Sequence, residues 1–161
     1  MSWWGSREKP SPRMIVEILA MKKLFNTTKP TIVRREIDWD RDFAIITESL
    51  DLVTGKEPYW LVKIRMKDKG EKPSPVYTLK ISYYGNFPHD EPEVRVPEIN
   101  VRETPHRYTD TRLCLTDHSG SRTGWDPSSS TAATVGLWSV EWLRAWKVWK
   151  QTGRWPEKGG T

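Results

Sequence analysis

The sequence predicts an α+β domain with an antiparallel sheet. The spacing of apolar residues changes from three and four near the N-terminus to strict alternation over the following hundred residues. No segment long enough for a crossover helix separates the consecutive alternating runs, which favours a meander over a parallel sheet. The expected order is an N-terminal helix, a four-stranded antiparallel meander, a long irregular segment and C-terminal helices.

The first element is an amphipathic helix that begins at Ser11 and Pro12. Serine suits the cap position and proline suits the first turn. Apolar residues then recur at helical spacing and predict a single buried face, and residues 26–30 end the helix. The residues expected on that face are Met14, Ile15, Ile18, Leu19, Met21 and Phe25.

Four alternating runs predict the strands. They cover residues 43–48, 60–66, 77–83 and 94–96. Gly55 follows and ends the first alternating run. A polar stretch with Gly70 and two prolines separates the second run from the third.

The segment 131–152 predicts the helical cover of one sheet face. Its apolar residues form one broad stripe. Three of its tryptophans, Trp138, Trp142 and Trp146, are spaced by four and therefore share a helix face. This spacing indicates a packed core rather than a stacking platform for nucleic-acid bases.

Length and composition indicate one globular domain spanning residues 1–161, with a core of about 11–156. The formal charge of +5 arises from scattered basic residues interleaved with acidic ones, which indicates a solvated surface with a mild preference for acidic partners. The single cysteine cannot form an internal disulfide. With no signal-like segment and no run of about 20 apolar residues, a cytoplasmic location without membrane contact is expected.

The irregular stretch 97–130 contains the only cysteine and two of the three histidines. A connection of this length in a compact domain is more often functional than idle. Taken alone, Cys114 between Leu113 and Leu115 is typical of a small buried hydrophobe. His106 alone is typical of a structural hydrogen-bonding residue, and Asp126-Pro127 of a turn.

Several motifs in this order resemble ubiquitin-conjugating enzymes over about residues 11–156. The run 77–81, followed by Phe87-Pro88, Pro92 and Val94, is similar to that family's third and fourth strands. Leu113-Cys114-Leu115 resembles the catalytic loop, and Trp125-Asp126-Pro127 resembles the family's tryptophan-x-proline element. The tail 142–156 resembles bacterial members encoded in antiphage or ubiquitin-like conjugation operons of the CBASS type.

The resemblance implies that Cys114 carries an acyl group as a thioester. It also exposes a departure, because Thr104-Pro105-His106 stands where the eukaryotic pattern is histidine-proline-asparagine. His106 at the asparagine position could donate a hydrogen bond to the developing oxyanion, or accept a proton from the attacking amine. Asp117 resembles the acidic residue that orients an incoming lysine, with His118 and Asp126 as alternatives for that role.

The resemblance further implies protein partners and no bound cofactor. The cargo would be a protein C-terminus, either of a cGAS-like nucleotidyltransferase or of a ubiquitin-like protein, delivered by an activating enzyme. Other interpretations remain open: a catalytically inactive adaptor with the same fold, or a cysteine hydrolase with His106 or His118 as base. A metal site would need His89 beside His106, Cys114 and His118, and the sequence has no second cysteine to complete a usual ligand set.

Overall fold

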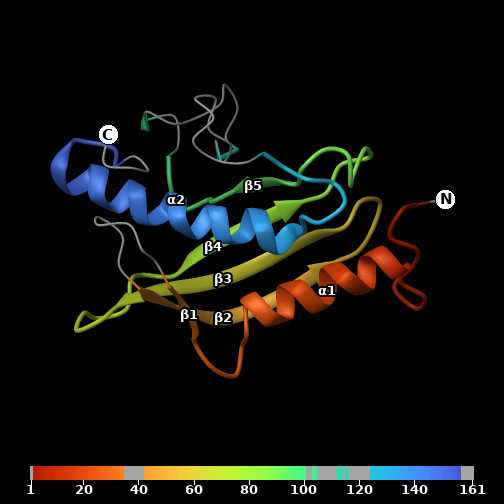
Figure 1. Cartoon of the computed structure of the whole chain (residues 1–161), viewed down its shortest axis with the longest axis horizontal. Coiled ribbons are helices and arrows are strands. Elements are labelled where there is room, and N and C mark those ends of the chain that lie inside the picture. The colour runs from red at the N-terminus through yellow and green to blue at the C-terminus, as the bar shows by residue number, and fades with distance from the viewer. Residues whose placement is uncertain are drawn as a thin grey trace.

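The computed structural model describes residues 2–34, 42–100, 103–104, 112–113, 115 and 124–156. These residues form two helices on one face of a five-stranded sheet (Figure 1). In chain order the elements are α1 (Pro12–Leu24), β1 (Thr31–Val33), β2 (Phe43–Val53), β3 (Tyr59–Asp68), β4 (Tyr77–Ser82), β5 (Glu93–Arg95) and α2 (Ala132–Thr152). The predicted α+β class is confirmed.

The sheet has one strand more than the predicted four. Its order is β1-β2-β3-β4-β5, and every neighbouring pair is antiparallel. The additional strand β1 pairs with β2 through Ile32 opposite Ala44. Strand β1 has three residues and follows the segment 26–30 that ends the helix, so no alternating run marks it in the sequence; β5 is equally short but was predicted at 94–96. The described residues also contain one C-terminal helix where several were expected.

Helix α1 begins as predicted, because the side chain of Ser11 accepts a hydrogen bond from the backbone N–H of Met14. Its buried face differs from the predicted one. Glu17 is fully buried, whereas Ile15 and Leu19 are 45% and 63% exposed. The helix carries more apolar residues than one face can bury, and a carboxylate occupies a core position because hydrogen-bond donors surround it.

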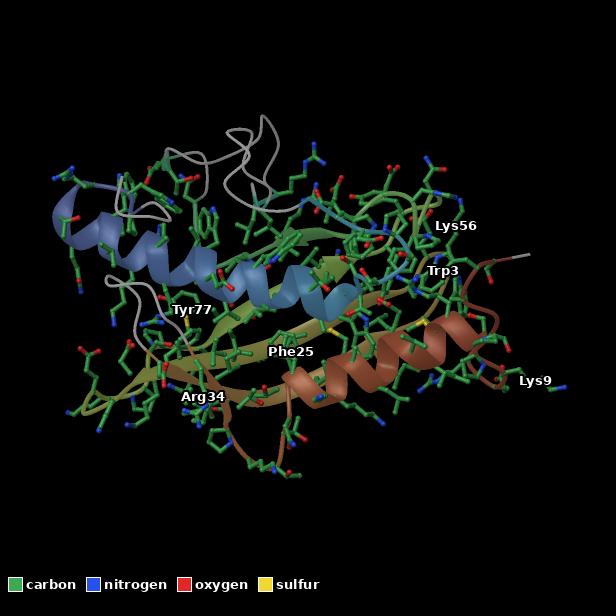
Figure 2. The ribbon with its side chains drawn as sticks, in the orientation of Figure 1. Trp3, Lys9, Phe25, Arg34, Lys56 and Tyr77 are labelled. Atoms are coloured by element: carbon green, nitrogen blue, oxygen red, sulfur yellow. The ribbon has the colours of Figure 1, made fainter. Side chains whose placement is uncertain are left out.

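Helix α2 lies across the sheet and packs against α1. Thr131 and Thr134 form a reciprocal capping box at its start, and Gly153 ends it in a left-handed conformation with φ of 77°. Gly136 lies directly against the residue that ends α1, because a Cβ there would lie 2.8 Å from the ring of Phe25. Figure 2 shows Phe25 between the two helices.

The N-terminal segment also contributes to the packing. Trp3 and Trp4 are partly buried against the core, and the N–H of Ser11 donates to the carbonyl of Trp4 at 2.9 Å. Packing against the hydrophobic core therefore includes residues that precede α1. No helix among the described residues is long and apolar enough to cross a membrane.

Candidate functional site

The chain on either side of Cys114 is anchored at the edge of the sheet. The N–H of Leu113 donates to the carbonyl of Val94 in β5 at 2.8 Å. Leu113 and Leu115 are only 3% and 6% exposed. Cys114, which joins them in sequence, lies outside the described residues. Its two neighbours are thus fixed by one backbone hydrogen bond and by burial of two leucine side chains.

Glu93 in β5 provides the second anchor for this segment. One carboxylate oxygen accepts from Arg112 at 3.0 Å. The other accepts from Arg95 at 3.0 Å and from the hydroxyl of Tyr84. Burial is the main cause that raises the pKa of Tyr84, and the hydrogen bond to Glu93 is the second cause. The Tyr84 hydroxyl therefore remains a donor near neutral pH. Charge-assisted hydrogen bonds of this kind are stronger than neutral ones, so Arg112 is held against β5.

A groove of about 670 Å³ lies beside Arg112. Its lining comes mainly from the loop that follows β4, with Arg112 and Trp125 added from later in the chain: Tyr84, Gly85, Asn86, His89, Asp90, Glu91, Glu93, Arg112 and Trp125. A groove of this size can admit an extended peptide or a long side chain. It is therefore the candidate approach to the cysteine-bearing segment.

Trp125 brings together two motifs that are far apart in sequence. Its indole N–H donates to the carbonyl of Pro88 at 2.6 Å, and its ring lies 5.9 Å from the ring of Phe87. The aromatic-proline pair and the tryptophan-x-proline element are consequently one structural unit at the groove. Sequence resemblance named both motifs, and the fold places them in contact.

Asp126 holds a turn. It is exposed, and its carboxylate accepts from the N–H of Ser128 at 3.0 Å and from the hydroxyls of Ser128 and Ser129 at 2.8 Å each. These hydrogen bonds, led by that from Ser128, lower the pKa of Asp126. This geometry matches the turn that Asp126-Pro127 indicated in sequence and leaves the carboxylate occupied with its own loop.

Behind the groove, a buried carboxylate joins both helices to the sheet. One oxygen of Glu17 accepts from the N–H of Ala132, the first residue of α2, at 2.7 Å and from the hydroxyl of Tyr83 at 2.8 Å. The tyrosine oxygen in turn accepts from the indole of Trp60 at 2.9 Å. Burial raises the pKa of Glu17 above its usual value of 4.5, although the hydrogen bond from Ala132 opposes this shift.

Arg13 in α1 completes this network. Its guanidinium donates to the carbonyls of Pro127 at 3.0 Å and Ser130 at 2.7 Å. It lies 3.3 Å from the second oxygen of Glu17, and its carbon lies 4.9 Å from the centre of the Phe87 ring. The Arg13 side chain therefore contacts the turn after Trp125, the buried carboxylate of Glu17 and the ring of Phe87.

The three residues predicted to act in catalysis, Cys114, His106 and Asp117, lie outside the described residues, as does His118. Of the predicted Thr104-Pro105-His106 motif, the structure describes Thr104, which is buried. The structure therefore describes the surroundings of the predicted site: the anchored leucines, the groove and the Trp125 turn.

Sequence reasoning missed Tyr84, Glu93 and Arg112. One pattern in the sequence could have indicated part of this cluster. Glu93 and Arg95 are two residues apart in a short strand, so their opposite charges lie on the same face. That pattern alone could not identify Arg112 as their partner, because the pairing depends on the return of the chain to β5.

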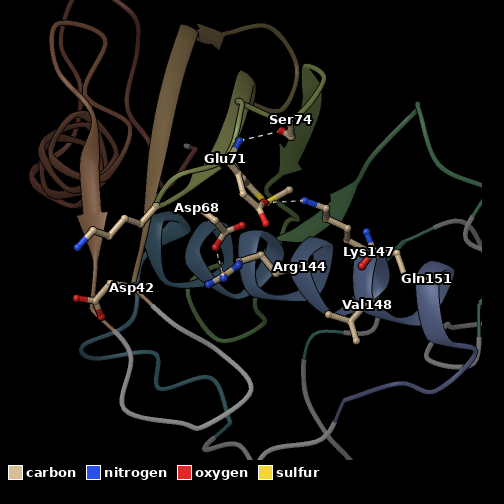
Figure 3. A pocket seen from close by; sticks show the side chains of 10 residues that line it. Asp42, Asp68, Glu71, Ser74, Arg144, Lys147, Val148 and Gln151 are labelled. Atoms are coloured by element: carbon tan, nitrogen blue, oxygen red, sulfur yellow. Dashed lines mark hydrogen bonds and ion pairs between the residues drawn. The ribbon is translucent and has the colours of Figure 1, made fainter.

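A second pocket of about 490 Å³ lies at the opposite end of β3 and β4, against α2 (Figure 3). Arg144 crosses it to Asp68 at 2.6 Å and stacks on Phe43 with 4.0 Å between the guanidinium carbon and the ring centre. Lys147 lies 3.7 Å from Glu71. These opposite charges compensate one another, so the pocket offers no strong preference for a charged ligand.

The α+β layout and the cysteine-bearing segment beside a groove are compatible with a conjugating-enzyme-like domain. The family model described as Type II CBASS E2 protein matches residues 17–161, and the chain belongs to this family. The resemblance seen in the sequence is thereby confirmed. No curated protein and no solved structure matches the chain. Membership in this family supports a role in antiphage conjugation.

Proposed function

We propose that this protein is a cysteine-dependent acyl carrier that receives a protein C-terminus on Cys114 and transfers it to an amine. The observation that carries the proposal is the anchoring of Leu113 and Leu115 beside the groove, in a chain whose family match spans Cys114. Cysteine suits this task because its thiolate is a strong nucleophile and its thioester remains reactive toward amines.

The proposed reaction has two acyl transfers. First, the thiolate of Cys114 attacks the cargo's C-terminal carbonyl, held as a thioester on an activating enzyme. A new C–S bond forms, the old one breaks, and the activating enzyme's cysteine leaves as a thiolate. Second, an acceptor amine attacks the Cys114 thioester. A C–N bond forms, Cys114 leaves as a thiolate, and the amine proton passes to a base.

His106 and Asp117 have proposed roles in the second transfer. His106 either donates to the oxygen on which negative charge develops or accepts the amine proton. Asp117 orients the incoming amine. Both roles rest on the family pattern and on the sequence positions of these residues.

The proposed partners follow from the same family. The cargo is a protein with a reactive C-terminus, either a cGAS-like nucleotidyltransferase or a ubiquitin-like protein. An activating enzyme supplies it in energised form, because a free carboxylate does not form a thioester spontaneously. The chain itself is proposed to work without a cofactor.

Intact-mass spectrometry after co-expression with the neighbouring genes tests this proposal. Wild-type protein is expected to carry an adduct with the mass of the cargo less one water, removable by hydroxylamine. Cys114→Ser should form a hydroxylamine-resistant ester, and Cys114→Ala should form no adduct. Full conjugation by Cys114→Ala would overturn the proposal.

The same experiment distinguishes the two alternative functions. An inactive adaptor would bind its partners without a covalent adduct in either wild type or Cys114→Ser. A hydrolase would release cargo with a free C-terminus and build up no conjugate when an amine acceptor is supplied. Accumulation of an amide-linked conjugate excludes both.

A further inference from the structure

Arg13 lies outside the segment matched by the family model. Its guanidinium donates to two carbonyls of the turn that follows Trp125, a residue that lines the groove. We propose that Arg13 is a positioning residue for the transfer reaction: it holds the turn 126–130 so that Trp125 forms a fixed wall of the groove. This inference rests on the proposed function of Cys114, and it adds a residue of α1 to the machinery of that site.

The geometry of the guanidinium explains why one side chain can fix the turn. Two of its nitrogens donate to the carbonyls of Pro127 and Ser130, three residues apart, while the third lies beside the carboxylate of Glu17. Glu17 is itself held by the first N–H of α2. The planar fork of arginine can donate to both carbonyls while its charge lies 3.3 Å from the carboxylate, whereas a lysine ammonium is a single point on a flexible stem.

The turn transmits this restraint to Trp125. The carbonyl of Asp126 accepts from the N–H groups of Ser129 at 3.2 Å and Ser130 at 2.8 Å, and the hydroxyl of Ser130 accepts from the N–H of Asp126 at 3.2 Å. A shift at Ser130 therefore shifts Asp126, the direct neighbour of Trp125. The five residues of the turn 126–130 are joined by these three hydrogen bonds and are therefore expected to move as one unit.

Arg13 also acts on Trp125 by a second route. Its guanidinium lies over the ring of Phe87, and the adjacent Pro88 carbonyl accepts the Trp125 indole N–H. The Phe87 ring also packs on Trp3 and Tyr83, at 4.4 Å and 4.6 Å between ring centres. The Arg13 guanidinium thus contacts both the turn 126–130 and the Phe87 ring, the two features that hold Trp125 in place.

A matched control exists elsewhere in the chain. Arg144 also lies on a helix, stacks on a phenylalanine and pairs with a carboxylate. Its partners are at the opposite end of β3, in the second pocket (Figure 3). Arg13→Lys and Arg144→Lys each replace a guanidinium that lies over a phenylalanine ring and beside a carboxylate, but only Arg13→Lys removes hydrogen bonds to the turn.

The test compares both variants with wild type in single-turnover transfer from purified Cys114 thioester, with acceptor concentration varied. Both variants should load Cys114 normally. Arg13→Lys should lower the maximal transfer rate by about tenfold, since small displacements of a reacting geometry are costly, while Arg144→Lys stays within about twofold of wild type. Equal transfer rates for the two variants would overturn the proposal.

Two readouts keep the inference separate from the proposed function. Hydrogen exchange at the Ser129 and Ser130 amides should accelerate in Arg13→Lys and not in Arg144→Lys. If wild type forms no thioester, the proposed function fails, and the rate of Cys114 alkylation by iodoacetamide replaces transfer as the measure. A changed alkylation rate in Arg13→Lys alone supports positioning, and an unchanged rate in both variants overturns it.

Discussion

Glu17 is the residue whose environment has the clearest consequence for stability. It is fully buried, and burial raises its pKa above the usual value of 4.5. A raised pKa in the folded state means that the folded protein binds this proton more tightly than the unfolded chain does. Glu17 therefore contributes stability that is fully present below pH 4.5 and is lost as the pH rises through the folded pKa.

Glu17→Gln should reveal this loss. Glutamine keeps an oxygen acceptor for Ala132 and Tyr83 but cannot ionise. The unfolding free energy of the variant minus that of wild type should therefore increase between pH 4 and pH 8, measured by urea denaturation. Tyr83 stays neutral across this range, because burial raises its pKa well above the usual value of 10.0. A difference that is constant or decreasing over the range would contradict a raised pKa for Glu17.

His106 is the residue whose chemistry the sequence leaves open between donor and base. We predict that His106→Ala slows transfer from the loaded thioester by about a hundred- to a thousandfold while loading remains largely intact, because one oxyanion donor contributes about that much. His106→Asn should retain activity if donation is what matters, since an amide can donate but is no useful base near neutral pH.

Single-turnover transfer followed from pH 6 to pH 9 separates the two roles of His106. A rate that rises with deprotonation of a group near neutral pH, and that is lost in His106→Asn, identifies a base. Transfer by His106→Ala at the wild-type rate throughout would leave His106 as a support of its loop.

Residue patterns predicted which segments are helical better than they predicted which side chains are buried. The spacing of Ile15 and Leu19 fits a buried face, yet both are exposed. Glu17 was not among the residues predicted on that face, yet its buried carboxylate accepts two hydrogen bonds and lies beside Arg13. A partner for a buried carboxylate comes from Ala132, which is 115 residues away, so local spacing cannot reveal it.

At the scale of elements, α2 depends on its aromatic face. Trp142 is 5% exposed and packs on Trp155, and Trp146 packs on Tyr77. These contacts agree with the structural role predicted from their spacing. Trp142→Ala should cost about 3–5 kcal/mol of unfolding free energy, the usual cost of removing a buried aromatic side chain.

Thermal melts of Trp142→Ala and Trp149→Ala provide the comparison, because Trp149 lies on the same helix and is half-buried. Trp142→Ala should show much the larger decrease in melting temperature. An unchanged melting temperature combined with lost partner binding would instead identify the face around Trp142 as an interface.

Gly136 sets the distance between α2 and Phe25. Alanine is the better helix former by about 1 kcal/mol, so propensity alone predicts stabilisation by Gly136→Ala. The added methyl would lie 2.8 Å from the fully buried Phe25 ring, and such overpacking typically costs about 1–3 kcal/mol. We expect net destabilisation by urea denaturation, with Gly55→Ala, which has open space around it, as the control. A stabilised Gly136→Ala would show that the Phe25 ring can move.

Among the elements, both helices and four of the five strands were predicted, and β1 was missed. Helices α1 and α2 and strands β2, β3 and β4 carry enough residues to show a period, and all five were predicted. Strand β1 has three residues, and its role in the sheet comes from pairing with β2 rather than from its own composition. Around the candidate site, the family resemblance predicted the motifs at Phe87 and Trp125. The Glu93–Arg112 pair and the hydrogen bonds from Arg13 to the turn 126–130 join residues far apart in sequence, so local patterns could not predict them.

Across the whole molecule, the helices and the N-terminal segment form one continuous layer behind the groove. Trp3 of the N-terminal segment contacts the Tyr83 ring at 4.8 Å between ring centres, and Tyr83 donates to Glu17, which binds the start of α2. Elements from both ends of the chain therefore meet in a single core. The family model begins at residue 17, inside α1, so its boundary cuts through this layer.

This arrangement predicts different fates for two truncated chains. Residues 11–161 keep the Ser11 cap and all of α1 but lose Trp3 and Trp4. We expect this chain to fold cooperatively, with a loss of about 2 kcal/mol that lowers the melting temperature by about 4–8 °C. Residues 17–161 lose the cap, Arg13 and the buried Met14, and place a new α-ammonium group on the fully buried Glu17. Because the start of α1 is gone and a charge brought into the core is strongly destabilising, we expect no cooperative melting transition for this chain.

Circular dichroism and scanning calorimetry of the two chains, at equal concentration and beside the full-length protein, measure these outcomes. The 11–161 chain controls for truncation itself, since both shortened chains lack the tryptophans and only one lacks the start of α1. Cooperative melting of residues 17–161 at the temperature of residues 11–161 would show that the Arg13–Glu17 pair and Met14 contribute little to global stability. Melting of residues 11–161 at the full-length temperature would show that Trp3 packs on Tyr83 and Phe87 without stabilising them.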